Sequence, residues 1–116
     1  VISLAEGVYE ELIDAGSALS GCGPAFVYQF IEALALAAES CGLPKEKALM
    51  YAEHTVAGAA RLAIQSGEQP QKLKDAVCSP GGSTIEGVRV FENQGLYRLV
   101  GNAVTASYNR TKELGK

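Results

Sequence analysis

Small and polar residues gather between positions 75 and 87, in the one segment whose residue types and spacing could support chemistry. It reads D-A-V-C-S-P-G-G-S-T-I-E-G. Pro80 lacks a backbone N–H and should end the preceding helix, while Gly81 and Gly82 permit positive φ and a close approach of ligand to backbone. Ser83 and Glu86 have the spacing of a capping box, which predicts that a new helix begins at Ser83.

The chemistry expected at such a helix start is anion binding. Its unpaired N–H groups and partial positive charge could hold a carboxylate or phosphate at Gly82, Ser83 and Thr84 without a basic side chain. An interhelical turn with a capped exit is the other interpretation, and the segment by itself leaves both open. A Walker phosphate loop is excluded because Ser83, not lysine, precedes Thr84. A dinucleotide fingerprint is excluded because no G-x-G-x-x-G follows a strand.

Length and charge narrow the class of protein. The 116 residues carry a formal net charge of −3, which suits one domain and argues against a nucleic-acid partner. No apolar run is expected to reach the roughly 18 to 20 residues that cross a bilayer, and the apolar segments carry glutamates at intervals, so we expect no membrane span and a soluble protein. No basic segment precedes Val1, so no signal peptide is expected, and a start at valine suggests a piece of a longer chain.

The thiols and the single imidazole offer no metal site. Cys22, Cys41 and Cys78 lack C-x-x-C spacing, so we interpret them as buried, reduced thiols of a cytoplasmic protein. His54 has no nearby Cys or Asp partner in an Ala-rich segment and is given no role. No metal is expected.

Apolar periodicity predicts about six helices, a fold in the all-α class. They are expected over residues 10–19, 25–41, 44–66, 71–77, 85–93 and 96 to the end, with Gly67 and Pro70 in a turn. The 25–41 segment is apolar on nearly all sides apart from a stripe through Gln29, Glu32 and Glu39. Such a helix needs cover on several sides, which predicts a second chain. Residues 1–6 have strand character without a pairing partner.

Two glycine-containing loops, taken together, resemble a known family. One is S-G-C-G-P at residues 20–24, and the other is V-C-S-P-G-G-S-T-I-E-G at 77–87. With the Gly42-Leu43-Pro44 turn and the closing helix around Asn102, they resemble the C-terminal domain of pyrroline-5-carboxylate reductase over about residues 12–114. Cys22 stands where Ser is common in that family, and Cys78 stands where Ser or Thr is usual.

The resemblance implies an enzyme that reduces the C=N bond of 1-pyrroline-5-carboxylate to L-proline, in proline biosynthesis. The cofactor, NADPH or NADH, would be held mainly by a preceding Rossmann domain. Residues 1–8 would then be a remnant of that domain's last strand, and residues 9–116 a helical dimerisation and substrate-binding domain that is inactive alone. The family also implies an intertwined homodimer that can assemble into rings of dimers.

Site residues follow from the same resemblance. Ser79 and the amides of Gly82, Ser83 and Thr84 would bind the substrate carboxylate, and the Thr84 hydroxyl would face the ring nitrogen as the catalytic group. Asp75 and Glu86 are the alternative acids, although capping and a solvated turn explain them more simply. A non-catalytic oligomerisation module and the helical domain of another NAD(P)-dependent dehydrogenase are the competing functions. The latter would be expected to carry a catalytic lysine, which neither loop contains.

Overall fold

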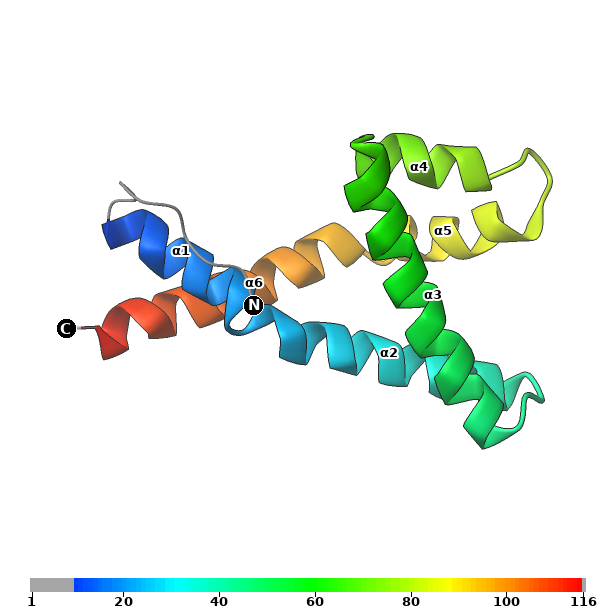
Figure 1. The fold of residues 1–116 in the computed structure, drawn as a ribbon, viewed down its shortest axis with the longest axis horizontal. Helices are drawn as coiled ribbons and strands as arrows, with labels where there is room; N and C mark the ends of the chain where they lie inside the picture. Colours follow the sequence, from blue (N-terminus) through cyan, green and yellow to red (C-terminus); the bar gives the residue numbers. More distant parts are fainter. Residues whose placement is uncertain (1–9, 116) are drawn as a thin grey trace. The chain divides into compact units, whose positions relative to one another are not determined.

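The computed structural model describes residues 10–115, and all regular structure in that range is helical. The helices are α1 (Glu10–Ser20), α2 (Gly23–Ser40), α3 (Lys45–Ser66), α4 (Pro70–Val77), α5 (Ser83–Asn93) and α6 (Leu96–Leu114), as Figure 1 shows. The prediction of an all-α chain is confirmed. The expected strand at 1–6 and the remnant at 1–8 lie outside the described residues.

The chain divides into two compact units. The first contains α1, the start of α2 up to Tyr28, and α6 with the preceding Gly95. Helices α1 and α6 pack against each other, and Ala18 on α1 is fully buried. A methyl group at this position lets the α1 backbone come close to its surroundings.

The second unit runs from Gln29 to Gln94 and contains most of α2 with α3, α4 and α5. Its buried core consists of three alanines, Ala35 on α2 and Ala48 and Ala52 on α3. Partly buried side chains surround them: Ile31, Leu34, Ala38 and Leu43. The packing is therefore close but narrow, because alanine removes little apolar surface from water compared with leucine or phenylalanine.

Helix ends follow the glycines and prolines, with small shifts from the predicted bounds. Gly67 ends α3 in the left-handed region at φ 68°, where its N–H donates to the Ala63 carbonyl. Pro70, expected in the turn, is instead the first residue of α4. Proline fits there because the first amide of a helix has no intrahelical acceptor.

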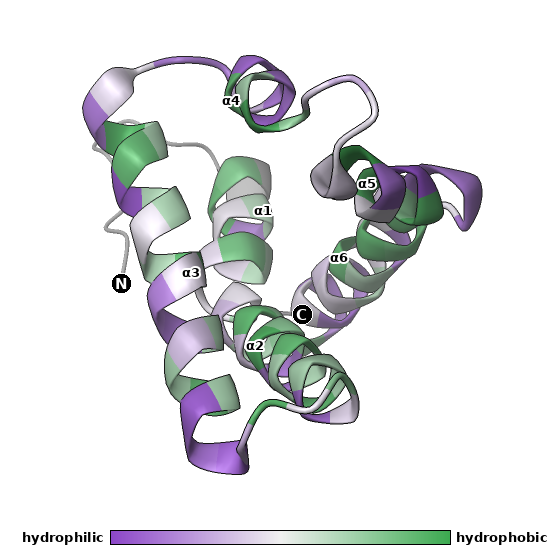
Figure 2. Cartoon of the chain, turned by 90° about the vertical axis from the view of Figure 1, so that its right-hand side faces the viewer, coloured by the Kyte–Doolittle hydropathy of each residue, from purple (hydrophilic) through white to green (hydrophobic). Residues whose placement is uncertain are grey.

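Apolar side chains remain exposed along α2. Val27, Tyr28, Phe30 and Leu36 are all more than two fifths exposed, and α2 is largely hydrophobic on the face shown in Figure 2. The prediction that α2 is too apolar for this chain to cover is confirmed. An unburied apolar helix in water requires another surface against it.

The expectation that no apolar stretch is long enough to span a membrane is wrong. Leu12–Ser40 is long and apolar enough to cross a membrane, by length and composition alone. The glutamates at intervals do not prevent this, since the stretch stays apolar on average around them. The chain turns at Gly21 and Cys22 within this stretch, so its residues belong to two helices, α1 and α2.

Candidate functional site

The α4–α5 connection is a short turn built on a glycine. Helix α4 ends with the Cys78 N–H donating to the Lys74 carbonyl at 3.2 Å and the Asp75 carbonyl at 3.1 Å. The Gly82 N–H then donates to the Ser79 carbonyl at 3.0 Å and closes the turn. Gly81 within it has φ 74°, in the left-handed region that glycine adopts without steric cost. We refer to residues 78–82 as the glycine turn.

At Gly82 the surrounding atoms leave little room for a side chain. The Gly82 backbone is extended, at φ −84° and ψ 175°. A Cβ built there would lie 3.2 Å from the Ser79 carbonyl oxygen and 3.5 Å from the Ser79 Cβ. Any side chain would therefore push against the carbonyl that closes the turn. The two glycines serve different needs, backbone conformation at Gly81 and close packing at Gly82.

The predicted capping box does not form. Gly82, not Ser83, is the N-cap residue of α5, and no side chain caps the helix. Ser83 is already the first helical residue, which puts Glu86 one position too far along to return to the N-cap amide. The Glu86 carboxylate instead accepts a hydrogen bond from Arg89, with 2.7 Å between Oε2 and Nη1. The turn closes on Gly82, so the N-cap lies one residue earlier than the box requires.

The amides available to a ligand shift by one residue for the same reason. The Gly82 N–H, named by the sequence as an anion donor, is used within the turn. The N–H groups of Ser83, Thr84 and Ile85 form the first turn of α5, where a helix provides no acceptor, and the described residues supply no other backbone or side-chain cap. Sequence analysis missed Ile85, and only the closure of the turn could have revealed it.

The side chains named as site residues gather at this one place. Ser79 lies in the glycine turn, and Ser83 and Thr84 are the first two residues of α5. All three are exposed. Their hydroxyl groups form no hydrogen bond with the described residues. Three hydroxyls and three open amides thus lie within a few residues, and the site can donate hydrogen bonds to an anion without a charged side chain.

Two helices hold the glycine turn, and an ion pair connects them. Lys74 Nζ on α4 lies 3.8 Å from Glu92 Oε2 near the end of α5. Asp75, considered above as an acid, is exposed and contributes its backbone carbonyl to the end of α4. Neither Asp75 nor Glu86 has an environment that marks it as a proton donor, since both are exposed and Glu86 is paired with arginine.

The second loop named by the sequence lies between α1 and α2, in the first unit. The Ser20 hydroxyl donates to the Gly16 carbonyl at 2.8 Å, and the Gly21 N–H donates to the Ser17 carbonyl at 2.9 Å. A Cβ at Gly21 would lie only 2.8 Å from that Ser17 oxygen. This glycine is required by the tight end of α1.

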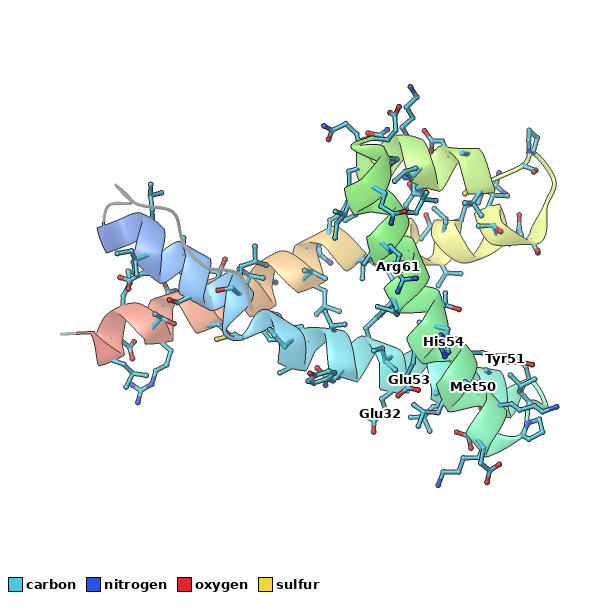
Figure 3. The ribbon with its side chains drawn as sticks, in the orientation of Figure 1. Glu32, Met50, Tyr51, Glu53, His54 and Arg61 are labelled. Atoms are coloured by element: carbon cyan, nitrogen blue, oxygen red, sulfur yellow. The ribbon has the colours of Figure 1, made fainter. Side chains whose placement is uncertain are left out.

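Other polar residues of the described chain form no further site. Cys22, Cys41 and Cys78 are free thiols, but the expectation that they are buried is wrong, since Cys41 is exposed and the other two are only partly buried. His54 is exposed on α3, among Glu53, Tyr51 and Met50 (Figure 3). Within residues 10–115, no three His, Cys, Asp or Glu side chains come together as metal ligands.

A narrow alanine core, a glycine turn at a helix start and apolar helix faces that this chain leaves uncovered define the class, an α-helical domain. The family model described as pyrroline-5-carboxylate reductase dimerisation matches residues 10–114. The chain belongs to this family.

Curated relatives agree with the match. A pyrroline-5-carboxylate reductase of Methanosarcina acetivorans is 44% identical over 115 residues, which is 99% of this chain and 43% of that protein. The Escherichia coli reductase is 43% identical over 97% of this chain and 42% of its own length. The chain thus spans about two fifths of the length of these relatives.

Solved structures share the fold. A pyrroline-5-carboxylate reductase from Coxiella burnetii superposes with a TM-score of 0.90 at 44% identity, over 94% of this chain and 40% of that one. A Plasmodium falciparum pyrroline carboxylate reductase, solved with NADP bound, gives a TM-score of 0.89 at 37% identity over 94% and 42% of the two chains.

Proposed function

We propose that this chain is the dimerisation and substrate-binding part of a pyrroline-5-carboxylate reductase, which reduces 1-pyrroline-5-carboxylate to L-proline with NADPH or NADH. The observation that carries the proposal is the set of open amides at Ser83, Thr84 and Ile85, directly after the glycine turn. The family match over residues 10–114 includes this whole segment.

The proposed site works by orientation. The substrate carboxylate would accept hydrogen bonds from the open amides of α5 and from the Ser79 hydroxyl, at the positive end of the helix dipole. With its carboxylate fixed, the five-membered ring has few orientations left, and the Thr84 hydroxyl would then face the ring nitrogen. A neutral hydroxyl suits this position because it neither repels a protonated imine nor competes with it for the carboxylate.

The described residues do not fit a dinucleotide. All their regular structure is helical, and no glycine-rich turn leads from a strand into a helix to bind a pyrophosphate. We therefore assign NADPH or NADH, which would supply the hydride, to a Rossmann domain elsewhere in a longer enzyme, with residues 1–8 as the end of its last strand and 9–116 as the helical domain. No metal is proposed.

The partner of the apolar helix faces would be a second copy of this chain. The exposed side chains of α2 and the description of the family as a dimerisation domain support a homodimer, which could assemble further into rings of dimers. We assign the enzyme to the cytoplasm, in keeping with three thiols that are free in the described residues.

Substitution of Thr84 tests the proposed function. In the full-length enzyme containing this chain, Thr84→Val should lower kcat/KM for pyrroline-5-carboxylate about 10-fold to 10³-fold, the scale of one oriented donor at a reacting centre. Thr84→Ser keeps the hydroxyl and should retain most of the activity. Thr55→Val is the matched control, since Thr55 is an exposed α3 residue whose hydroxyl donates to the Tyr51 carbonyl. Equal rates for Thr84→Val and the control would remove Thr84 from the mechanism.

A further inference from the structure

The ion pair between Lys74 and Glu92 differs from the others in the described chain. Those others join residues three or four positions apart: Lys72 with Glu68, Arg89 with Glu86, and Arg110 with Glu113. Lys74 and Glu92 lie 18 positions apart, on α4 and α5. Within residues 10–115, it is thus the pair that fixes one helix against another by charge.

Lys74 also contacts the glycine turn directly through its backbone. Its carbonyl accepts the Cys78 N–H at 3.2 Å, the first hydrogen bond of the turn, while its ammonium group reaches Glu92 at 3.8 Å. The Lys74 side chain is only 30% exposed, against 75% for Lys72 on the same helix. Glu92 is 52% exposed, so the shielding of the pair comes from the lysine side, where water and salt screen the charge less.

We propose that Lys74 and Glu92 are positioning residues that hold α4 and α5 at the separation the glycine turn requires, and so keep the Ser83–Ile85 amides aligned for the substrate carboxylate. This proposal rests on the proposed function of the site. Neither side chain is placed on the substrate. Their effect on the substrate passes through the glycine turn. Loss of the ion pair should therefore weaken substrate affinity more than it slows the reaction of the bound complex.

Kinetics of the full-length enzyme provide the first test. Lys74→Met and Glu92→Gln should each raise KM for pyrroline-5-carboxylate about twofold to fivefold, the range expected when a partly exposed ion pair is lost, with kcat nearly unchanged. The charge-exchanged double variant, Lys74→Glu with Glu92→Lys, should recover most of the loss. Lys72→Met is the matched control, because it removes a lysine of the same helix that pairs only within four residues.

The two variants also separate positioning from direct attraction of the substrate by the Lys74 charge. If the ammonium group attracted the carboxylate itself, Glu92→Gln would leave KM unchanged or lower it, and the charge exchange would not restore binding. Either result would overturn the proposal. Glu92→Gln keeps the shape of the side chain, so it decides the question even where Lys74→Met folds poorly.

Amide hydrogen exchange in this 116-residue chain gives a readout independent of activity. The Cys78 and Gly82 amides, both hydrogen-bonded in the turn, should exchange about twofold to fivefold faster in Lys74→Met and Glu92→Gln than in wild type or Lys72→Met. Unchanged exchange in both variants would refute the positioning role. Faster exchange without any reductase activity in the wild-type full-length enzyme would refute the proposed function instead.

Discussion

Phe30 on α2 provides the sharpest test of association. Its side chain is 42% exposed, beside the apolar positions Phe26, Ala33 and Ala37 and away from the polar stripe of the helix. A phenylalanine side chain presents roughly 150–250 Å², so about 60–105 Å² remains available for burial. At about 25 cal/mol per Å², covering this area contributes about 1.5–2.6 kcal/mol per protomer.

A two-fold dimer contains the contact twice, so replacing Phe30 removes about 3–5 kcal/mol from the free energy of association. Phe30→Glu should therefore raise the dimer dissociation constant about 10²-fold to 10⁴-fold, and burial of a new carboxylate would increase the effect. The matched control is Gln29→Glu, which adds the same charge to the polar stripe of the same helix and should change the dissociation constant little.

Sedimentation equilibrium over a range of chain concentrations measures both constants, with helicity followed by circular dichroism. The reasoning would be refuted by a wild-type chain that is monomeric at micromolar concentration. It would equally fail if Phe30→Glu and Gln29→Glu, at equal helicity, dissociated at the same concentration.

Three further predictions concern the turns and the isolated chain. Gly81→Ala should lower the free energy of unfolding by about 1–2 kcal/mol, since only its left-handed backbone opposes a side chain. Gly87→Ala on α5, where the Cβ also meets open space, should raise the free energy of unfolding by about 0.4–1 kcal/mol. Equal stability of the Gly81→Ala and Gly87→Ala variants in denaturant unfolding would contradict both expectations. Gly21→Ala should destabilise by about 1–3 kcal/mol, because its Cβ would lie 2.8 Å from the Ser17 carbonyl, and a wild-type unfolding midpoint would show that the turn can yield. The isolated chain given NADPH and pyrroline-5-carboxylate should form no proline, and turnover in a proline assay would place a cofactor site within these residues.

Sequence alone predicted the helices well because their signals are local. Glycine and proline punctuation set most ends to within one or two residues, and the excess of apolar residues on α2 correctly indicated a surface that this chain leaves uncovered. These features depend on neighbours within a few positions, which a single sequence displays directly.

The N-cap of α5 could not be predicted in the same way. Ser83 and Glu86 match the capping-box spacing, but the hydrogen bond from Gly82 to Ser79 takes precedence and makes Gly82 the N-cap. Two local motifs competed for the same residues, and a spacing rule does not say which one wins. The ion pair between Lys74 and Glu92 was missed for a different reason, since it depends on how two helices pack.

The alanine core has a consequence for thermal denaturation. The buried side chains of the described chain are all alanines. In the proposed homodimer, much of the favourable burial would therefore come from the surfaces in contact between the two copies. Melting then becomes a reaction in which one folded pair yields two unfolded chains. The midpoint of this melting reaction should rise with protein concentration, so the melting temperature of this domain depends on its concentration.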